Sequence, residues 1–324
     1  MAKQSLEEKL ARLKRIEEGL CPDDAVREIR QALSGANNIL SARAAQSAAI
    51  LKLRDLGQEL IAVFDRCMQN PAKTDPGCRA KLAAIEALNA LDYPGADIFL
   101  RGIRHVQMEW SFGQPVDTAD NLRAACAFGL YRLGHPELLF ELVTLLTDVQ
   151  PAARRAAIKI LTEPGHEWSE LLLRMKVLQG DREVVVLGDC FSGLMAIAPL
   201  HSLRFVAQFI LSEDAGIAEE AALAIGNSRL PEAFALLCDY RNDSVAPAFK
   251  RMLLLPIALT RCDEAFNLLI SVVKEEHPDN AEAAVQALSI YGNNPERHGQ
   301  IREAVFARND PSISAAYEKE MAGR

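Results

Sequence analysis

The chain has 324 residues, of which 49% are apolar and 25% charged, a balance typical of proteins that fold in water. The longest apolar stretch, residues 191–211, is interrupted by Pro199, His201 and Arg204, which argues against a membrane-spanning helix there. Residues 1–20 have the pattern of a charged amphipathic helix, not of a signal peptide, so we expect a cytoplasmic protein. The seven cysteines are scattered singly without a CxxC pair, as expected for buried thiols in a reducing compartment.

The net charge of −8 is unevenly distributed along the chain. Residues 1–162 carry 21 Lys+Arg and 20 Asp+Glu, a balance of +1, whereas residues 163–324 carry 15 and 24, a balance of −9. An acidic second half disfavours a nucleic-acid partner along the whole surface and leaves only the first half for a local basic patch.

The first expected helix covers residues 5–20, and a second one starts after Pro22. We interpret residues 1–37 as a helical cap on the repeats that follow; the alternative is an arm that binds a partner. From residue 38 onward, short helices follow one another in pairs. Residues 118–148 show the unit best: Asp120 stands at an expected N-cap, and apolar residues recur at spacings of three and four in both helices. Two such helices cannot bury both apolar faces without neighbours, which predicts a stack of repeats.

An aspartate is expected to open the second helix of each pair. These aspartates are Asp75, Asp120, Asp148, Asp181, Asp214, Asp243, Asp279 and Asp310, separated by 45, 28, 33, 33, 29, 36 and 31 residues. Each is followed by a run rich in small residues, and alanine suits close helix packing as well as helix formation. The later helix pairs are expected at residues 149–180, 181–213, 214–242, 243–278 and 279–309.

This pattern resembles the HEAT-repeat family, including the short HEAT-like units of the phycobilisome-lyase type. The resemblance rests on the opening aspartates, the alanine-rich second helices and the nearby Arg79, Arg123 and Arg155, and it covers residues 38–324. It implies an all-α fold, a right-handed α-solenoid of about nine antiparallel helix pairs that forms one elongated domain. Second helices would line its concave surface. Tetratricopeptide repeats have a similar period, but their Trp, Gly, Tyr and Pro pattern does not recur here.

The longest aspartate spacing contains an insertion at residues 107–118, which follows a helix expected at about 95–109. Strand signals are almost absent from the sequence, and even the run at 184–187 is expected to be helical. Two interpretations of the insertion compete. In one, its aromatic residues plug the junction between repeats; in the other, a loop at the rim contacts a partner. The residues that would make this contact are Gln107, Glu109, Trp110, Phe112 and Asp117.

Arginines recur near the starts of the second helices: Arg79, Arg123, Arg154 and Arg155. They fit a structural ladder in which each arginine pairs with the aspartate of an adjacent repeat. They also fit a basic stripe on the concave face, extended by Lys52, Lys81 and Lys159, that binds an acidic peptide or phosphate. HEAT-like DNA glycosylases use such a face, but the acidic second half of this chain weakens that analogy.

The sequence offers no catalytic motif, and we predict neither a cofactor nor a metal. His166-Glu167 resembles the iron-binding His-Glu pairs of deoxyhypusine hydroxylase, yet no other histidine is followed by glutamate. A nucleophile elbow and a glycine-rich phosphate loop are both missing. We therefore predict a non-enzymatic scaffold that binds another protein through its concave face and the 107–118 loop. The alternatives are a HEAT-like lyase or enzyme accessory of the bilin-lyase type and a nucleic-acid-binding HEAT protein.

Overall fold

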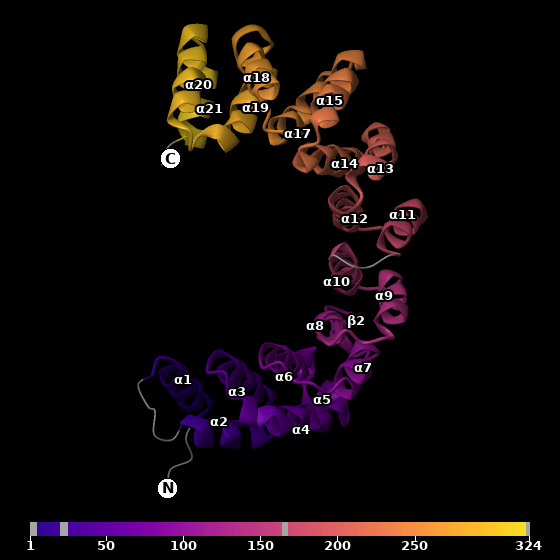
Figure 1. The fold of residues 1–324 in the computed structure, drawn as a ribbon. Coiled ribbons are helices and arrows are strands. Elements are labelled where there is room, and N and C mark those ends of the chain that lie inside the picture. Colours follow the sequence, from indigo (N-terminus) through magenta and orange to yellow (C-terminus); the bar gives the residue numbers. More distant parts are fainter. Residues whose placement is uncertain (1–4, 20–24, 164–167, 322–324) are drawn as a thin grey trace. The chain divides into compact units, whose positions relative to one another are not determined.

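The computed structural model describes residues 5–19, 25–163 and 168–321, and His166-Glu167 falls outside these ranges. The chain divides into two compact units, Met1–Ile160 and Leu161–Arg324. Within each unit, the described residues form the all-α helical-repeat fold predicted from the sequence (Figure 1). None of the helices in the described part of the chain combines the length and hydrophobicity needed to cross a lipid bilayer.

The first unit contains ten α-helices in its described residues, the last of which runs two residues past the boundary. They are α1 (Leu6–Glu17), α2 (Ala25–Ser34), α3 (Asn38–Ile50), α4 (Gly57–Met68), α5 (Pro71–Thr74), α6 (Arg79–Ala90), α7 (Asp97–Ile103), α8 (Asp120–Arg132), α9 (Leu138–Leu146) and α10 (Pro151–Thr162). Two short 3₁₀ helices, η1 (Arg54–Leu56) and η2 (Pro76–Cys78), precede α4 and α6.

Helices α3, α6 and α8 lie side by side in one row, and α2, α4 and α7 pack against that row (Figure 1). Small side chains make this close packing possible. Ala44, Ala45 and Ala48 of α3 and Ala80 and Ala84 of α6 are completely buried. The alanine-rich runs therefore serve the purpose that the sequence indicated, because they let neighbouring helix backbones approach one another.

The second unit repeats the same arrangement. Its described helices are α11 (Ser169–Gln179), α12 (Val184–Ile197), α13 (Pro199–Ala207), η3 (Gln208–Leu211), α14 (Ala215–Ser228), α15 (Pro231–Asp243), α16 (Pro247–Met252), α17 (Leu254–Leu259), α18 (Asp263–Glu275), α19 (Pro278–Leu288), η4 (Ser289–Tyr291), α20 (Pro295–Arg308) and α21 (Pro311–Met321). Successive row helices α12, α14, α17, α19 and α21 contact one another. The 184–187 run lies at the start of α12, so it is helical as expected.

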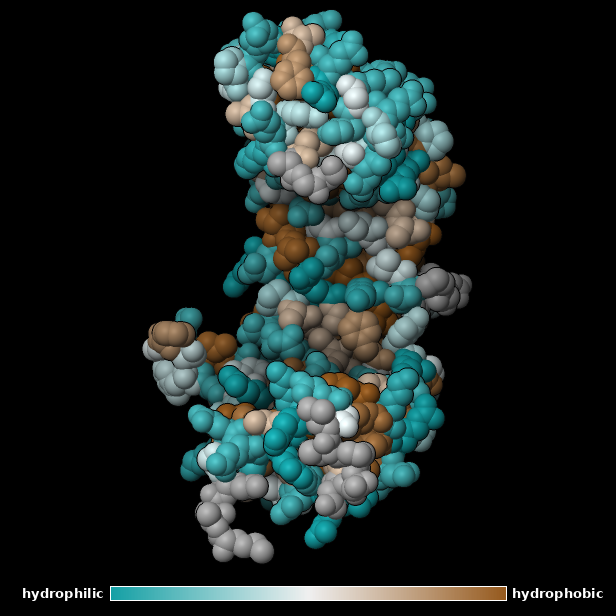
Figure 2. Space-filling view, turned by 90° about the vertical axis from the view of Figure 1, so that its left-hand side faces the viewer, coloured by the Kyte–Doolittle hydropathy of each residue, from teal (hydrophilic) through white to brown (hydrophobic). Residues whose placement is uncertain are grey.

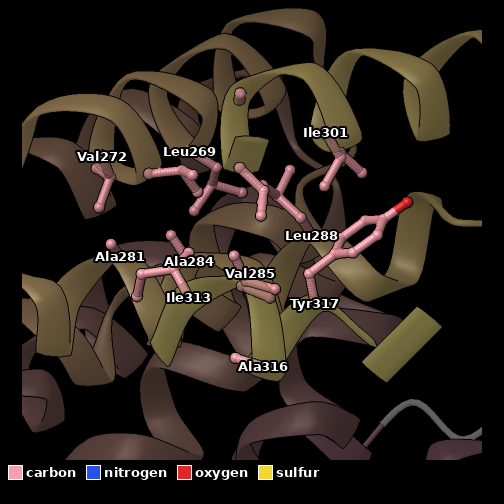
Figure 3. Packing of buried hydrophobic residues seen from close by; sticks show 14 of the residues in the cluster. Leu269, Val272, Ala281, Ala284, Val285, Leu288, Ile301, Ile313, Ala316 and Tyr317 are labelled. Atoms are coloured by element: carbon pink, nitrogen blue, oxygen red, sulfur yellow. The ribbon is translucent and has the colours of Figure 1, made fainter. Parts of the chain in front are cut away.

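Figure 3 shows how three helices of the second unit, α18, α19 and α21, share one hydrophobic core. Leu269 and Val272 of α18 meet Ala284 and Val285 of α19, and Ile313 of α21 closes the cluster from the next repeat. All five side chains are at most 1% exposed. Each helix pair is therefore completed by side chains from its neighbour, which is the reason why one pair could not fold alone.

Most of the repeating aspartates lie where a helix begins, as predicted. Asp75 accepts two backbone N–H groups in the first turn of α6, at 2.9 and 3.0 Å, and Asp214 caps α14 at 2.9 and 3.3 Å. Two predictions were wrong. Asp120 is not an N-cap but the first residue of α8, and Asp243 ends α15 instead of opening a helix. The helix after α15 begins at Pro247, four residues later than predicted.

The region expected to be a long helix followed by a loop has a different structure. Helix α7 ends at Ile103, and the chain then forms a β-hairpin from β1 (Met108–Ser111) and β2 (Gln114–Asp117). This hairpin belongs to the first unit and fills the insertion at residues 107–118. The sequence does not indicate this hairpin, because two four-residue strands contain too few alternations of polar and apolar residues.

Candidate partner-binding site

The hairpin has a tight two-residue turn. Strands β1 and β2 are antiparallel, Ser111 faces Gln114, and only Phe112 and Gly113 lie between them. Both turn residues have positive φ angles, 49° and 82°, a combination that matches the natural twist of a hairpin. Glycine adopts this conformation freely, but an L-residue with a side chain pays about 1–2 kcal/mol for it. Phe112 is therefore a poor choice for hairpin stability.

The hairpin exposes its large apolar side chains. Phe112 is 106% exposed, Trp110 80% and Met108 52%. The interpretation that the aromatic residues plug a repeat junction is therefore wrong, since plugging would require burial. Hydrophobic residues also reach the surface elsewhere, in separate patches among hydrophilic ones on the face drawn in Figure 2. A cluster of exposed aromatic residues on a protruding element is typical of an interaction site.

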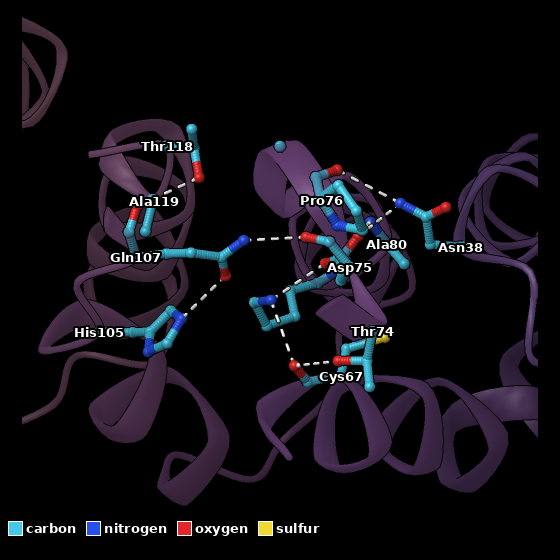
Figure 4. A network of polar contacts seen from close by, with 12 residues as sticks. Asn38, Cys67, Thr74, Asp75, Pro76, Ala80, His105, Gln107, Thr118 and Ala119 are labelled. Carbon is cyan, nitrogen blue, oxygen red and sulfur yellow. Dashed lines mark hydrogen bonds and ion pairs between the residues drawn. The ribbon is translucent and has the colours of Figure 1, made fainter. Parts of the chain in front are cut away.

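The base of the hairpin, in contrast, is buried and fixed by hydrogen bonds. The Gln107 side chain is 2% exposed, and its Nε2 donates to the Asp75 carbonyl oxygen at 2.8 Å and to Glu109 Oε1 at 2.6 Å. Its backbone N–H donates to Asp117 Oδ1 at 3.0 Å, which ties the two ends of the insertion together. Figure 4 shows Gln107 lying between Asp75 and His105.

Glu109 connects the hairpin to the preceding repeat. Its Oε1 accepts hydrogen bonds from the backbone N–H of Gly77 at 2.8 Å and from Thr118 Oγ1 at 2.9 Å, besides that from Gln107. Burial by itself would raise the pKa of Glu109, but the hydrogen bonds from Gln107, Gly77 and Thr118 outweigh it and lower the pKa. Glu109 is thus held as a carboxylate within the base of the hairpin.

Beneath Gln107 lies a completely buried ion pair. Lys81 Nζ is 3.1 Å from Asp75 Oδ2, and both side chains are inaccessible to solvent. Asp75 also accepts a hydrogen bond from Asn38 Nδ2 of α3 at 3.1 Å, and Lys81 donates to the Cys67 carbonyl oxygen of α4 at 3.3 Å (Figure 4). This network joins α3, α4, α6 and the hairpin, so three consecutive repeats position the hairpin base.

Arg123 supports the hairpin from the following repeat. Its guanidinium forms a two-pronged ion pair with Asp148, at 2.7 and 2.9 Å, and contacts Asp117 Oδ2 and the His105 carbonyl oxygen, both at 2.8 Å. Burial would lower the pKa of Arg123, but the hydrogen bonds and charges of Asp148 and Asp117 outweigh it and raise the pKa. Arg123 therefore occupies the position that the ladder alternative predicted.

The four arginines of the predicted series divide into two groups. Arg154 is buried like Arg123 and donates to the carbonyl oxygens of Asp148 and Val149 at 2.8 and 2.9 Å. Arg79 and Arg155 are exposed. Of the predicted site residues, the structure brings Gln107, Glu109, Asp117 and Arg123 into one network at the base of the hairpin.

The sequence suggests Lys81 as an extension of a basic surface stripe, since a lysine in an alanine-rich helix is normally exposed, but the fold buries its side chain against Asp75. Met108 is not among the predicted contact residues. Met108 did give a signal, because Met108 and Trp110 alternate with polar residues directly before the Phe-Gly turn. Among residues 5–19, 25–163 and 168–321, no group of three or more His, Cys, Asp or Glu side chains could hold a metal ion.

Comparisons with known proteins show similarity only at the level of structure. No family model matches the chain, and no curated protein matches it. The complex of CpcE and CpcF of phycocyanin lyase from Nostoc sp. PCC7120 is similar at 15% identity and a TM-score of 0.35, over 87% of this chain and 94% of that chain. An engineered protein is similar at 14% identity and a TM-score of 0.37, over 99% of this chain and 97% of that chain. At these scores neither likeness carries an argument about function.

Proposed function

We propose that this protein is a non-enzymatic helical-repeat adaptor that binds another protein through the tip of its β-hairpin, formed by Met108, Trp110, Phe112 and Gly113. The surface around the exposed Arg79 would supply additional contacts to acidic groups of the partner. The concave face predicted from the family resemblance remains part of this proposal.

The observation that carries the proposal is the conformation of Phe112. A bulky residue with a φ of 49° is strained, and its fully exposed ring gains no packing within the described chain in return. Local strain of this kind is usually retained at sites that have a function. Binding of the ring by a partner would supply the missing apolar contacts. The buried base of the hairpin supports this, because it presents the tip without a large loss of conformational freedom on binding.

Site-specific photo-crosslinking in the native cell tests the proposal. A photoreactive phenylalanine analogue replaces Phe112 in one sample and Phe140, a 74% exposed aromatic residue of α9, in the control. We expect one abundant protein to be crosslinked at position 112 and not at position 140. The variant Trp110→Ser/Phe112→Asn should lose that partner in a pull-down while keeping its helical circular-dichroism spectrum. Equal crosslinking at both positions, or a pull-down that the double variant leaves unchanged, would refute the proposal.

The second candidate is an enzyme accessory of the bilin-lyase type. A protein of that type would bind a pigment, which absorbs visible light. Absorbance of the purified protein after mixing with a free bilin distinguishes the two candidates: a shifted, saturable absorbance band favours the accessory, and an additive spectrum favours the adaptor.

A further inference from the structure

The register of the hairpin determines which backbone groups face outward. In a hairpin with a two-residue turn, the pair next to the turn exchanges hydrogen bonds and the following pairs alternate. Ser111 and Glu109 therefore bond to β2, and the same alternation continues in the bond from the Thr118 N–H to the Gln107 carbonyl oxygen at 2.9 Å. Met108 and Trp110 must then direct their N–H and C=O groups away from β2. Within the described part of the chain, these groups have no hydrogen-bond partner.

The two edges of the hairpin are not equivalent. On β2, the residue opposite Trp110 is Pro115, which has no N–H to offer. Strand β1 contains neither proline nor lysine, the residues that commonly protect an edge from pairing. Its one charged residue, Glu109, is engaged with Gly77 and Thr118 at the base. Met108 and Trp110 are 52% and 80% exposed, so the β1 edge is both unpaired and accessible.

We propose that the outer edge of β1 binds an extended segment of the partner protein as the third strand of the sheet. This proposal rests on the proposed function of the hairpin and adds how the partner is recognised. The segment would pair its backbone with the N–H and C=O groups of Met108 and Trp110. It would contain no proline at the paired positions and would place apolar side chains opposite Met108 and Trp110, on the same face of the sheet.

An extended peptide fits this edge better than a helix or a second copy of the chain. A helix has no free backbone groups along its side, so it could not pair with a strand edge. A second copy of the chain would pair β1 with β1 around Glu109, and this would place two glutamates directly opposite each other. Like charges in that position are unfavourable in a sheet. A peptide from another protein avoids this conflict.

The experiment starts from a library of linear ten-residue peptides displayed on phage and selected on the full-length chain. Selected peptides are synthesised, and their dissociation constants are measured for the wild type, Met108→Ala and Met108→Pro. Both variants lose the methionine side chain, but only proline also loses the outward-facing N–H. Pro115 shows that the hairpin accommodates proline at an outward-facing position. We expect Met108→Pro to bind about tenfold more weakly than Met108→Ala, a loss of the size expected for a hydrogen bond whose partner is left unpaired.

Methylation of the peptide backbone provides a second readout that does not depend on the folding of any variant. N-methyl groups are introduced at one peptide residue at a time. A strand alternates its backbone groups with a period of two, so methylation should abolish binding at every second residue and be tolerated in between. A period of three to four, or no periodicity, would overturn strand addition, as would equal binding to Met108→Pro and Met108→Ala.

Failure of this inference can be separated from failure of the proposed function. If selected peptides lose affinity for Trp110→Ser/Phe112→Asn but not for Met108→Pro, the hairpin tip binds partners through side chains alone and strand addition is wrong. If the peptides bind the double variant as well as the wild type, the proposed function fails too. If the chain alone forms a dimer that Met108→Pro dissociates, the occupant is a second copy and the proposal is overturned.

Discussion

Arg123→Met is the substitution whose cost follows most directly from the structure. Arg123 is 4% exposed at its side chain and neutralises Asp117 and Asp148, which are 8% and 14% exposed. Methionine has a similar length and an apolar side chain, so the main consequence is two nearly buried carboxylates without a counter-charge. Breaking a buried ion pair on one side typically costs about 3–5 kcal/mol. Because Asp148 can turn partly toward solvent, we expect about 3 kcal/mol.

Two matched variants separate this cost from general effects of mutation. Arg54→Met removes an arginine from an exposed ion pair, with Arg54 and Asp92 71% and 61% exposed, and should cost less than about 0.5 kcal/mol. The triple variant Arg123→Met/Asp117→Asn/Asp148→Asn carries no buried charge at this site, so it should recover much of the loss.

Stability is measured by urea unfolding followed by far-ultraviolet circular dichroism, together with hydrogen exchange of the α8 amides. In a repeat protein the effect should be largest near the substitution, so exchange should accelerate in α8 and remain unchanged in α19. If Arg123→Met costs no more than Arg54→Met, or if the triple variant is as unstable as the single one, Arg123 does not neutralise buried carboxylates and the reasoning is refuted.

Three further predictions concern the hairpin and the helix packing. Phe112→Asn should stabilise the hairpin by about 1 kcal/mol, because asparagine tolerates a positive φ, and hydrogen exchange of the hairpin amides should slow about fivefold. Gly226→Ala should cost about 2 kcal/mol in urea unfolding, since its Cβ would lie 2.1 Å from the Pro256 carbonyl oxygen, whereas Gly299→Ala, with nothing within 4 Å, should stabilise α20 by about 1 kcal/mol. The lowered pKa of Glu109 means that its contribution to stability is complete above the ordinary value of 4.5 and is lost as the pH falls through the lower folded-state value. The difference in urea stability between the wild type and Glu109→Gln should accordingly shrink as the pH falls below 4.5, and a constant difference would contradict it.

The sequence by itself determined the repeat architecture. Helix pairs are short-range structures, and their sequence signals lie within a few residues of one another. Examples are Asp214, which caps α14, and the alanine-rich run after Asp75. The sequence also indicated Trp110 and Phe112 as candidate partner contacts, since they are two aromatic residues close together in a chain with only 6% aromatic residues.

Only the tertiary structure decided the roles of the charged residues. Arg79 and Arg123 occupy similar positions in the repeat pattern, yet the first is exposed and the second is buried between Asp117 and Asp148. Lys81 likewise reads as a surface residue until the fold places it against Asp75. Burial and ion pairing depend on side chains that lie tens of residues apart in sequence. How close these side chains come in space is set by how one repeat stacks on the next.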